Sequence, residues 1–273
     1  MRQPDALPED FAAAFETTRE RLGPFAARIL FYDEIGSTND VAAALAASGS
    51  SEHAVVIADM QTAGRGRRGR RWFSPPGSGL YVSAVLAPHR STDPVRATSL
   101  LTLAAGVALA EAIQSSTGLV PDIKWPNDLL VARRKLGGIL AEGVSIPGSD
   151  SHLLRVVLGF GINVNPAAYP SELRTAATSL ETELGRRIDR AIVCAECLIA
   201  LRRRYEDLLA GRFDAILDDW RRRAPGSRGA RVRWDDATGT QRGISAGIDE
   251  SGALLVQSDD TLHRLVAGEV FWD

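Results

Sequence analysis

The pattern of hydrophobic residues changes at residues 224–229, a short stretch rich in Pro, Gly and Ser. Beyond it, short apolar runs alternate with turns rich in Asp, Gly and Ser, a spacing typical of a small all-β barrel. Before it, predicted strands occur in runs and predicted helices occur in runs, without regular strand–helix alternation. We therefore predict two domains, residues 1–224 and 225–273. The first is expected to be an α+β domain in which helices pack on a mixed sheet.

Hydrophobic periodicity places the individual elements. Helices are predicted at residues 9–22, 41–47, 95–116, 188–209 and 213–223. Strands of the first domain are predicted at residues 28–35, 54–58, 80–86, 122–125, 129–132, 138–144 and 153–160. Strands of the barrel are predicted at residues 231–234, 243–248, 253–257 and 261–266. The loop at residues 61–79 is too long for a simple connection, so it is expected to be functional.

Composition argues against several classes of function. The formal net charge is −2, so no general attraction to nucleic acid or to an anionic membrane is implied. No stretch approaches the ~18 apolar residues of a membrane span, and the N-terminal residues lack the apolar core of a signal peptide. These features predict a cytoplasmic protein without a membrane partner. Cys194 and Cys197 form a CxxC inside a predicted helix, where cysteines usually behave as buried hydrophobes.

The loop at residues 61–79 contains the densest group of chemically active side chains. Its segment GRGRRGRRW, residues 64–72, contains five arginines. Glycines let main-chain N–H groups approach an anion closely, arginine binds phosphate or carboxylate bidentately, and Trp72 and Phe73 can stack on a flat ring. No GxxxxGK[ST] motif of a phosphate-binding loop occurs. The segment therefore favours nucleotide binding, with nonspecific RNA binding as the alternative.

Lysine is rare in this chain. Among the 32 Lys and Arg residues, only Lys124 and Lys135 are lysines, and they begin the segments KWPND and KLGGI. Lysine is a compact point charge, whereas arginine is planar and forked. A chain that otherwise uses arginine is expected to keep lysine where a point charge is needed. The alternative is that GC-rich coding favours arginine and that the two lysine positions are chance.

Three further features add ligand-binding chemistry. Asn127 can hydrogen-bond the edge of a base, and Asp128 can hold Mg²⁺. The glycine pair after Lys135 and the segment GFGIN at residues 159–163 let a ligand lie against bare main chain. Each of these segments can also be an ordinary tight turn.

Five motifs occur in a fixed order along the chain. They are GSTN at residues 36–39, QxAGRGRxGR at 61–70, KWPND at 124–128, KLGGI at 135–139 and GxGINV at 159–164. In this set and this order the chain resembles biotin protein ligases. The resemblance covers residues 35–273. It implies a class II synthetase-like catalytic domain followed by an SH3-like barrel.

The resemblance implies a reaction in two steps. In the first, the biotin carboxylate attacks the α-phosphate of ATP in the presence of Mg²⁺, giving biotinyl-5′-AMP and pyrophosphate. In the second, a lysine of a biotin carboxyl carrier protein domain attacks the mixed anhydride and releases AMP. ATP and Mg²⁺ are therefore the expected co-substrate and metal, biotin is the expected substrate, and no tightly bound prosthetic group is expected.

The resemblance also implies roles for single residues. Biotin is expected to contact Ser37, Thr38, Asn39, Gln61, Gly64, Arg65, Gly66, Arg67, Lys135, Gly138 and Gly161, with the first four at the ureido ring and the last two as the floor. ATP and the adenylate are expected to contact Arg65, Arg67, Arg70, Trp72, Asn127 and Asn163. Arg67 and Lys135 are expected to be catalytic, by stabilising charge where the carboxylate meets the α-phosphate. Asp128 is the candidate metal ligand.

Two other functions have to be weighed. A lipoate ligase or octanoyltransferase of the same superfamily would share the fold and a lysine near the carboxylate, but it should lack the Arg-rich loop and KWPND. A nucleic-acid-binding module would use that loop and the barrel, but the barrel turns are crowded with aspartates, which make a poor phosphate surface. Some biotin ligases bind operator DNA through an N-terminal helix-turn-helix domain. Too few residues precede the first motif here for such a domain, so no specific DNA binding is expected.

Overall fold

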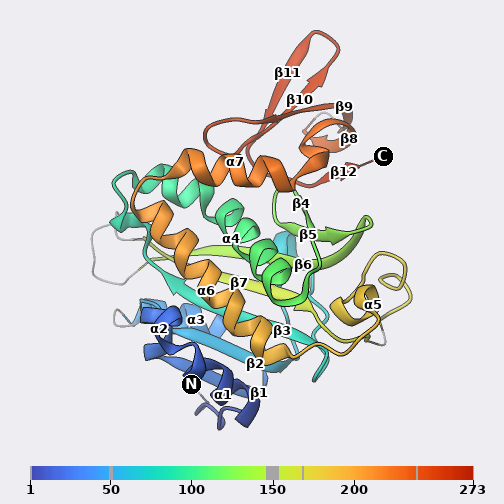
Figure 1. The fold of residues 1–273 in the computed structure, drawn as a ribbon. Coiled ribbons are helices and arrows are strands. Elements are labelled where there is room, and N and C mark those ends of the chain that lie inside the picture. The colour runs from blue at the N-terminus through green and yellow to red at the C-terminus, as the bar shows by residue number, and fades with distance from the viewer. Residues whose placement is uncertain (1, 49–51, 146–153, 168, 238, 273) are drawn as a thin grey trace.

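The computed structural model describes residues 2–48, 52–145, 154–167, 169–237 and 239–272. The predicted start of a strand at Leu153 and the predicted domain ends at Met1 and Asp273 lie outside these residues. Within them the chain forms a seven-stranded sheet and a separate five-stranded sheet, as the cartoon shows (Figure 1).

The larger sheet is mixed, as predicted. Its strands are β1 (Ile29–Ile35), β2 (Val55–Gln61), β3 (Gly79–Leu86), β4 (Asp122–Lys124), β5 (Asp128–Val131), β6 (Arg134–Ser145) and β7 (Leu154–Asn163). Their order across the sheet is β1-β2-β3-β7-β6-β5-β4. β1 and β2 are parallel, and the other neighbouring strands are antiparallel. β6 and β7, whose sequences contain the glycine motifs, therefore lie side by side inside the sheet.

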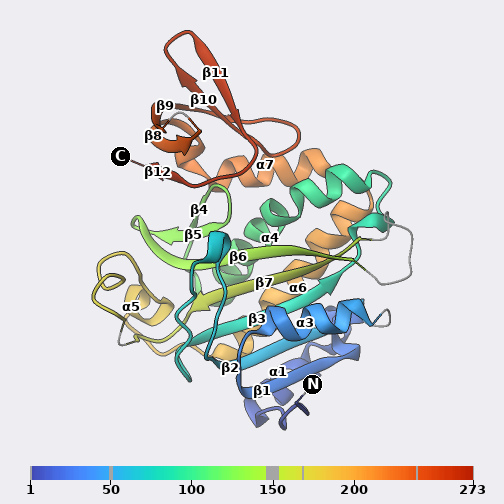
Figure 2. The same cartoon turned by 180° about the vertical axis from the view of Figure 1, so that it is seen from behind.

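Helices cover both faces of this sheet (Figures 1 and 2). They are α1 (Glu9–Thr17), α2 (Arg19–Leu22), α3 (Thr38–Ala47), α4 (Pro94–Thr117), α5 (Leu180–Leu184), α6 (Arg190–Leu209) and α7 (Phe213–Arg223). α4 and α6 pack on one face and belong to the main hydrophobic core. α3 packs on the other face, where its alanines and Leu45 form a second, smaller core with the sheet. The start of α3 therefore lies on the face opposite α4.

α4 is the central helix of the core. It begins after Asp93, whose side chain accepts a hydrogen bond from the main-chain N–H of Arg96, and Pro94 occupies its first turn. It ends at Gly118, which has a left-handed φ of 84°. Among the described residues α4 alone is long and apolar enough to cross a membrane, but 72% of its apolar window is buried inside the fold. It is the core helix of this domain.

The two cysteines lie on the buried face of α6, as predicted. Cys194 and Cys197 are both 0% exposed and are not joined in a disulfide. Burial raises the pKa of the Cys194 thiol to about 12, so the thiol stays protonated near neutral pH. The CxxC of this chain therefore packs as a pair of small hydrophobes.

Some predicted boundaries were wrong. The helix predicted at residues 9–22 breaks at Thr18, where φ is −105° and ψ is 11°; the Thr18 hydroxyl hydrogen-bonds the Ala14 carbonyl oxygen. β2 extends to Gln61 and β7 extends to Asn163, so both side chains lie on strand ends instead of in loops. α5 and the last strand, β12, were not predicted because both are very short.

The five-stranded sheet follows α7. Its strands are β8 (Arg228–Asp236), β9 (Gly239–Ile248), β10 (Leu254–Ser258), β11 (Thr261–Leu265) and β12 (Val270–Trp272). It packs against the larger domain through the turn at Gly252, whose carbonyl oxygen accepts from Trp125 Nε1 at 3.0 Å. A Cβ at Gly252 would lie only 2.6 Å from Leu103 Cδ1 of α4, so glycine allows the close approach. The domain boundary at residues 224 and 225 stays a prediction.

Candidate active site

A cavity of about 340 Å³ lies between strands β6 and β7 and the Arg-rich loop, residues 62–78. The start of α3, the end of β2 and the turn between β4 and β5 complete its walls, and residues 268–270 of the second sheet reach its rim. The predicted site residues that line it are Ser37, Thr38, Asn39, Gln61, Arg65, Gly66, Arg67, Arg70, Trp72, Asn127, Asp128, Lys135, Gly138, Gly161 and Asn163. All five motifs therefore meet at one cavity.

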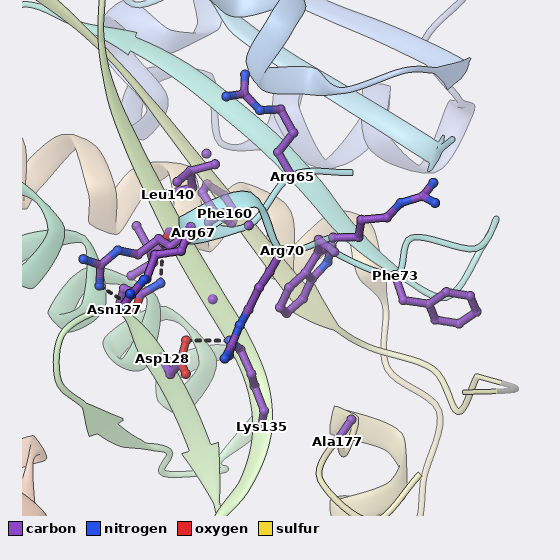
Figure 3. A pocket seen from close by; sticks show the side chains of 18 of the residues that line it. Arg65, Arg67, Arg70, Phe73, Asn127, Asp128, Lys135, Leu140, Phe160 and Ala177 are labelled. Carbon is purple, nitrogen blue, oxygen red and sulfur yellow. Dashed lines mark hydrogen bonds and ion pairs between the residues drawn. The ribbon is translucent and has the colours of Figure 1, made fainter. Parts of the chain in front are cut away.

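Two parts of the cavity differ in chemistry, and we name them by their residues. The polar end is formed by Ser37, Thr38, Asn39 and Gln61. The charged end is formed by Arg67, Asn127, Asp128 and Lys135, which gather from the loop, from the turn after β4 and from β6 (Figure 3).

Three of the four side chains at the polar end, Thr38, Asn39 and Gln61, are held by hydrogen bonds within the protein. Gln61 Oε1 accepts from the Thr38 main-chain N–H at 2.9 Å, and Gln61 Nε2 donates to Ser74 Oγ at 2.9 Å. Ser83 Oγ lies 2.7 Å from Thr38 Oγ1 and 2.6 Å from Asn39 Oδ1. Because these buried groups have partners within the protein, their side chains are held in one orientation.

Asn39 is the most constrained side chain of the polar end. It is 4% exposed, and its Nδ2 donates to Glu142 Oε2 at 2.7 Å. A Cβ at Gly159 would come within 2.0 Å of Asn39 Oδ1. Glycine is therefore required at position 159 because the asparagine amide fills the space above the strand.

The predicted floor of the cavity is bare main chain. Gly138 of β6 and Gly161 of β7 lie directly opposite each other in the sheet. The indole of Trp72 rests on them: a Cβ at Gly161 would lie 2.4 Å from Trp72 Nε1, and a Cβ at Gly138 would lie 3.2 Å from Trp72 Cζ3. The indole N–H of Trp72 is buried and has no hydrogen-bond partner among the residues described. The glycines thus make room for a flat ring, and Trp72 occupies that room here.

Lys135 is held at the charged end by its main chain and its side chain. Its N–H donates to the Ala176 carbonyl oxygen at 2.7 Å, and its carbonyl oxygen accepts from the Thr178 N–H at 2.9 Å. Its ammonium Nζ lies 2.6 Å from Asp128 Oδ1 and 5.5 Å from the centre of the Trp72 ring. The lysine predicted to act as a point charge therefore faces the cavity beside a carboxylate.

Arg67 approaches the same place from the loop. Its guanidinium Nη1 donates to Asn127 Oδ1 at 3.3 Å, and Asn127 Nδ2 donates to the Ile139 carbonyl oxygen at 2.8 Å. The Ile139 contact fixes the Asn127 amide so that its oxygen faces Arg67. Burial lowers the pKa of Arg67 while Asp128 opposes that shift; the group remains charged because arginine starts from such a high value.

Arg65 and Arg70 also line the cavity, but carboxylates hold their guanidinium groups. Arg65 lies 2.7 Å from Asp40 and 2.5 Å from Glu142, and it points away from the charged end (Figure 3). Arg70 makes a bidentate pair with Glu269, which immediately precedes β12 of the second sheet, at 2.6 and 2.5 Å. Their predicted contacts with substrate stay predictions, because each would require a change of partner.

Gly64 is the one predicted residue that does not line the cavity. It lies where the two arms of the Arg-rich loop run antiparallel and hydrogen-bond each other. Its carbonyl oxygen accepts from the main-chain N–H of Trp72 at 2.9 Å, and the main-chain N–H of Gly66 donates to the Arg70 carbonyl oxygen at 2.8 Å. A Cβ at Gly64 would lie 2.5 Å from the Trp72 carbonyl oxygen. Glycine at position 64 therefore shapes the loop.

Asn163 and Lys124 lie at the edges of the cavity. Asn163 Nδ2 donates to the Thr178 carbonyl oxygen at 2.9 Å, which ties the end of β7 to the segment that holds Lys135. Lys124 faces the second sheet, with Nζ 6.0 Å from the Phe271 ring centre and 5.8 Å from that of Trp272. Burial lowers the pKa of Lys124.

Ser83, Glu142 and Glu269 were not predicted from the sequence. Ser83 is 0% exposed and lies inside a strand that is otherwise buried and apolar. A polar residue inside a buried apolar strand is a signal that could have identified Ser83. Glu142 lies in the partly exposed half of β6, where a charged residue gives no such signal. Glu269 follows a glycine in an exposed turn, and no comparable pattern points to it.

Comparisons with known proteins agree with this arrangement. Residues 33–163 match the model of the biotin/lipoate A/B protein ligase family, and residues 229–272 match the biotin protein ligase C-terminal domain. The bifunctional ligase/repressor BirA of Bacillus subtilis is 36% identical over 244 residues, which cover 89% of this chain and 73% of that protein.

Two further relatives resemble the chain over most of its length. The biotin–[acetyl-CoA-carboxylase] ligase of Mycobacterium tuberculosis is 34% identical over 253 residues, covering 87% of this chain and 86% of that one. The structure of the biotin protein ligase of Aquifex aeolicus, in complex with biotin and ATP, superposes with a TM-score of 0.77 at 26% identity. It covers 90% of this chain and 99% of that one. The chain therefore belongs to the biotin protein ligase family, whose C-terminal domain corresponds to its five-stranded sheet.

Proposed function

We propose that this chain activates biotin with ATP as biotinyl-5′-AMP and transfers it to a lysine of a biotin carboxyl carrier protein domain. ATP-dependent biotinylation of a carrier protein is the activity of the family to which the chain belongs. One observation supports the assignment above all others: the polar end and the charged end share one cavity. Biotin has the same two features, a neutral ureido ring at one end and a carboxylate at the other.

The polar end suits the ureido ring. A cyclic urea presents two N–H donors and one carbonyl acceptor, and each needs a partner when it is buried. Ser37, Thr38 and Asn39 at the start of α3, with Gln61 from β2, bring hydroxyl and amide groups to the cavity wall. Ser37, Thr38 and Asn39 are each no more than 4% exposed. Hydrogen bonds to Ser74, Ser83 and Glu142, and one between Thr38 and Gln61, fix the Thr38, Asn39 and Gln61 side chains before a ligand arrives.

The charged end suits the first chemical step. A biotin carboxylate oxygen forms a bond to the α-phosphorus of ATP as the bond to the bridging oxygen breaks, and pyrophosphate leaves. Both reactants are anions, so cations must lower their repulsion and stabilise the charge that shifts toward the leaving group. Lys135 and Arg67 provide these cations. Asp128, 2.6 Å from the lysine ammonium, keeps Lys135 aimed at the cavity.

Asp128 is also the carboxylate that we propose for Mg²⁺. Mg²⁺ in nucleotide sites is usually held by one or two carboxylates together with substrate phosphates. Asp128 is a partly exposed carboxylate at the same end of the cavity as Arg67 and Lys135, so the donor set fits. The bound metal would neutralise phosphate charge at this end.

The adenylate would use the remaining residues. We assign Trp72 to cover it and Asn127 and Asn163 to contact adenine. Arg70 would exchange Glu269 for a phosphate oxygen, because both partners accept the same bidentate pair of N–H groups. Trp72 would leave the glycine floor, which frees that surface for the ligand.

The second step requires an acceptor lysine at the rim. Its neutral amine attacks the acyl carbon of the mixed anhydride, an amide bond forms, and AMP leaves as the acyl–phosphate bond breaks. We propose that the acceptor domain belongs to a biotin-dependent carboxylase and that the reaction takes place in the cytoplasm. Two free, buried thiols in α6 suit such a reducing compartment.

Two observations weigh against the other functions. The buried polar end would be a poor match for the alkyl chain of a lipoyl or octanoyl group, whereas a ureido ring needs donors and acceptors. In the Arg-rich loop, Arg65 and Arg70 are each held by carboxylates of this chain, which lowers the positive charge that a nucleic acid would meet.

ATP–pyrophosphate exchange with and without biotin tests the proposed function. Exchange that depends on biotin is expected, because pyrophosphate reforms ATP only from biotinyl-5′-AMP. Exchange without biotin, or no exchange in its presence, would contradict the assignment. Octanoate and lipoate in place of biotin serve as controls and are expected to support no exchange.

A further inference from the structure

Glu142 of β6 contacts two of the residues that the motifs singled out, although it is not itself part of a motif. Its Oε2 accepts from Asn39 Nδ2 at 2.7 Å, and its Oε1 lies 2.5 Å from Arg65 Nη2. It does not line the cavity. One carboxylate therefore joins the polar end of the cavity to the beginning of the Arg-rich loop.

We propose that Glu142 is a positioning residue that couples the polar end to the Arg-rich loop, so that biotin binding and loop placement depend on each other. The proposal rests on the ligase function argued above. It adds a role for a residue that does not line the cavity, and it predicts a defect in biotin binding before any ATP is present.

Glu142 sets the orientation of the Asn39 amide. A carboxylate can only accept hydrogen bonds, so Asn39 must turn its NH₂ group toward Glu142. Its Oδ1 is then directed to Ser83 Oγ, 2.6 Å away, above the bare main chain of Gly159. A glutamine at position 142 offers both a donor and an acceptor, so it would no longer fix which way the Asn39 amide points.

Glu142 also holds the Arg-rich loop, through Arg65. The two carboxylates that hold Arg65 come from different elements, Asp40 from α3 and Glu142 from β6. The arms of the loop are joined by the hydrogen bonds between Gly64 and Trp72 and between Gly66 and Arg70. An anchor at Arg65 therefore also fixes the arm that contains Trp72, whose indole covers the floor.

The partners of Arg65 differ in a way that supplies a matched control. The side chain of Glu142 is 29% exposed and also binds Asn39, whereas that of Asp40 is 57% exposed and, among the described residues, pairs with Arg65 and not with the polar end. Both substitutions remove one carboxylate from Arg65. Only the change at position 142 also alters the polar end.

The experiment measures biotin affinity by calorimetry without ATP, for the wild type, Glu142→Gln and Asp40→Asn. Loss of a charge-assisted hydrogen bond at a partly buried site predicts about a tenfold weaker Kd for Glu142→Gln. Asp40→Asn is expected to stay within about twofold, as for other exposed pairs. Tryptic cleavage after Arg68 is followed in parallel: biotin should slow it in the wild type and in Asp40→Asn, but not in Glu142→Gln.

Arg65→Gln tests the same link from the exposed side of the loop, in case Glu142→Gln does not fold. It should weaken biotin binding, and the double variant should be no weaker than the worse single variant, because both remove one coupling. Equal Kd values and equal protection for Glu142→Gln and the wild type would overturn the proposal. A wild type that binds no biotin and shows no biotin-dependent exchange would instead contradict the ligase function itself.

Discussion

The two ends of the cavity are built by different means. At the polar end, Thr38 hydrogen-bonds Gln61, and Ser83 of β3 hydrogen-bonds Thr38 and Asn39; all of these side chains except Gln61 are almost completely buried. At the charged end, side chains from the loop, the β4–β5 turn and β6 meet, and Lys135 and its partner Asp128 remain 37% and 22% exposed. The polar end is therefore held by hydrogen bonds within the folded protein. The charged end consists of partly exposed charged side chains that meet where a loop, a turn and a strand come together.

This difference has an energetic consequence. A buried neutral hydrogen bond contributes about 0.5–1.5 kcal/mol and leaves an unsatisfied group when one partner is removed. An exposed ion pair contributes about 0–1 kcal/mol and is screened by salt. Changes at the polar end should thus affect stability and biotin affinity together. Changes at the charged end should affect the chemical step with little loss of stability.

Lys135→Arg is expected to have the largest effect. It keeps the positive charge but replaces a point charge with a planar fork that does not fit between Asp128 and Trp72. Adenylate formation should slow about a hundredfold, as for loss of one transition-state contact, with Tm within a few degrees of the wild type. Single-turnover formation of biotinyl-5′-AMP measures the rate. A rate within threefold would show that any cation suffices at this position.

Gly161→Ala should have the next largest effect. The added Cβ would lie 2.4 Å from Trp72 Nε1, so the indole must leave the floor and the methyl group then occupies ligand space. Biotin affinity should fall about tenfold. Gly36→Ala is the matched control, because an added Cβ there meets nothing within 4 Å. Equal biotin Kd values for the two variants would show that Gly161 does not form part of the biotin site.

Ser83→Ala tests whether a change at the polar end lowers both stability and biotin affinity. It removes the hydroxyl that lies between Thr38 and Asn39 and leaves a buried amide oxygen without its partner. The free energy of unfolding should fall by about 1–3 kcal/mol, together with a several-fold weaker biotin Kd and an unchanged KM for ATP. Denaturant titration and calorimetry measure these quantities. A change confined to the KM for ATP would contradict the division between the ends.

Glu269→Gln should have the smallest effect. Its pair with Arg70 joins the second sheet to the loop, but the Arg70 side chain is 65% exposed. The loss of stability should stay below about 1 kcal/mol. The KM for ATP should shift at low salt, and the shift should disappear at high salt. Steady-state assays over a salt series measure it, and a shift that persists at high salt would show that the pair does more than hold an exposed arginine.

The sequence predicted the fold class and most elements because their apolar patterns are strong. The burial of the two cysteines in α6 followed from those patterns. The sequence could not predict the break at Thr18, where the threonine hydroxyl hydrogen-bonds a carbonyl oxygen of the preceding turn. Strand β12 was also not predictable, because it is too short to show periodicity.

The motifs identified which residues meet at the cavity, but not which of them are already paired with other side chains of this chain. Charge and glycine content predicted that Arg65 and Arg70 would face phosphate. Their carboxylate partners, Asp40, Glu142 and Glu269, lie far away in the sequence, so no local pattern shows the pairing. The same holds for Trp72 resting on Gly138 and Gly161, which depends on how the loop folds back over β6 and β7.

The most direct test of the account is biotin-dependent ATP–pyrophosphate exchange measured across a salt series. If the neutral polar end holds the biotin ring, and the charged end holds the ATP phosphates and the biotin carboxylate, the KM for ATP should rise more than about fivefold with increasing salt. Over the same range the KM for biotin should change less than about twofold, because most of its contacts are neutral and buried. Exchange that needs no biotin, or equal salt dependence of the two KM values, would contradict the account.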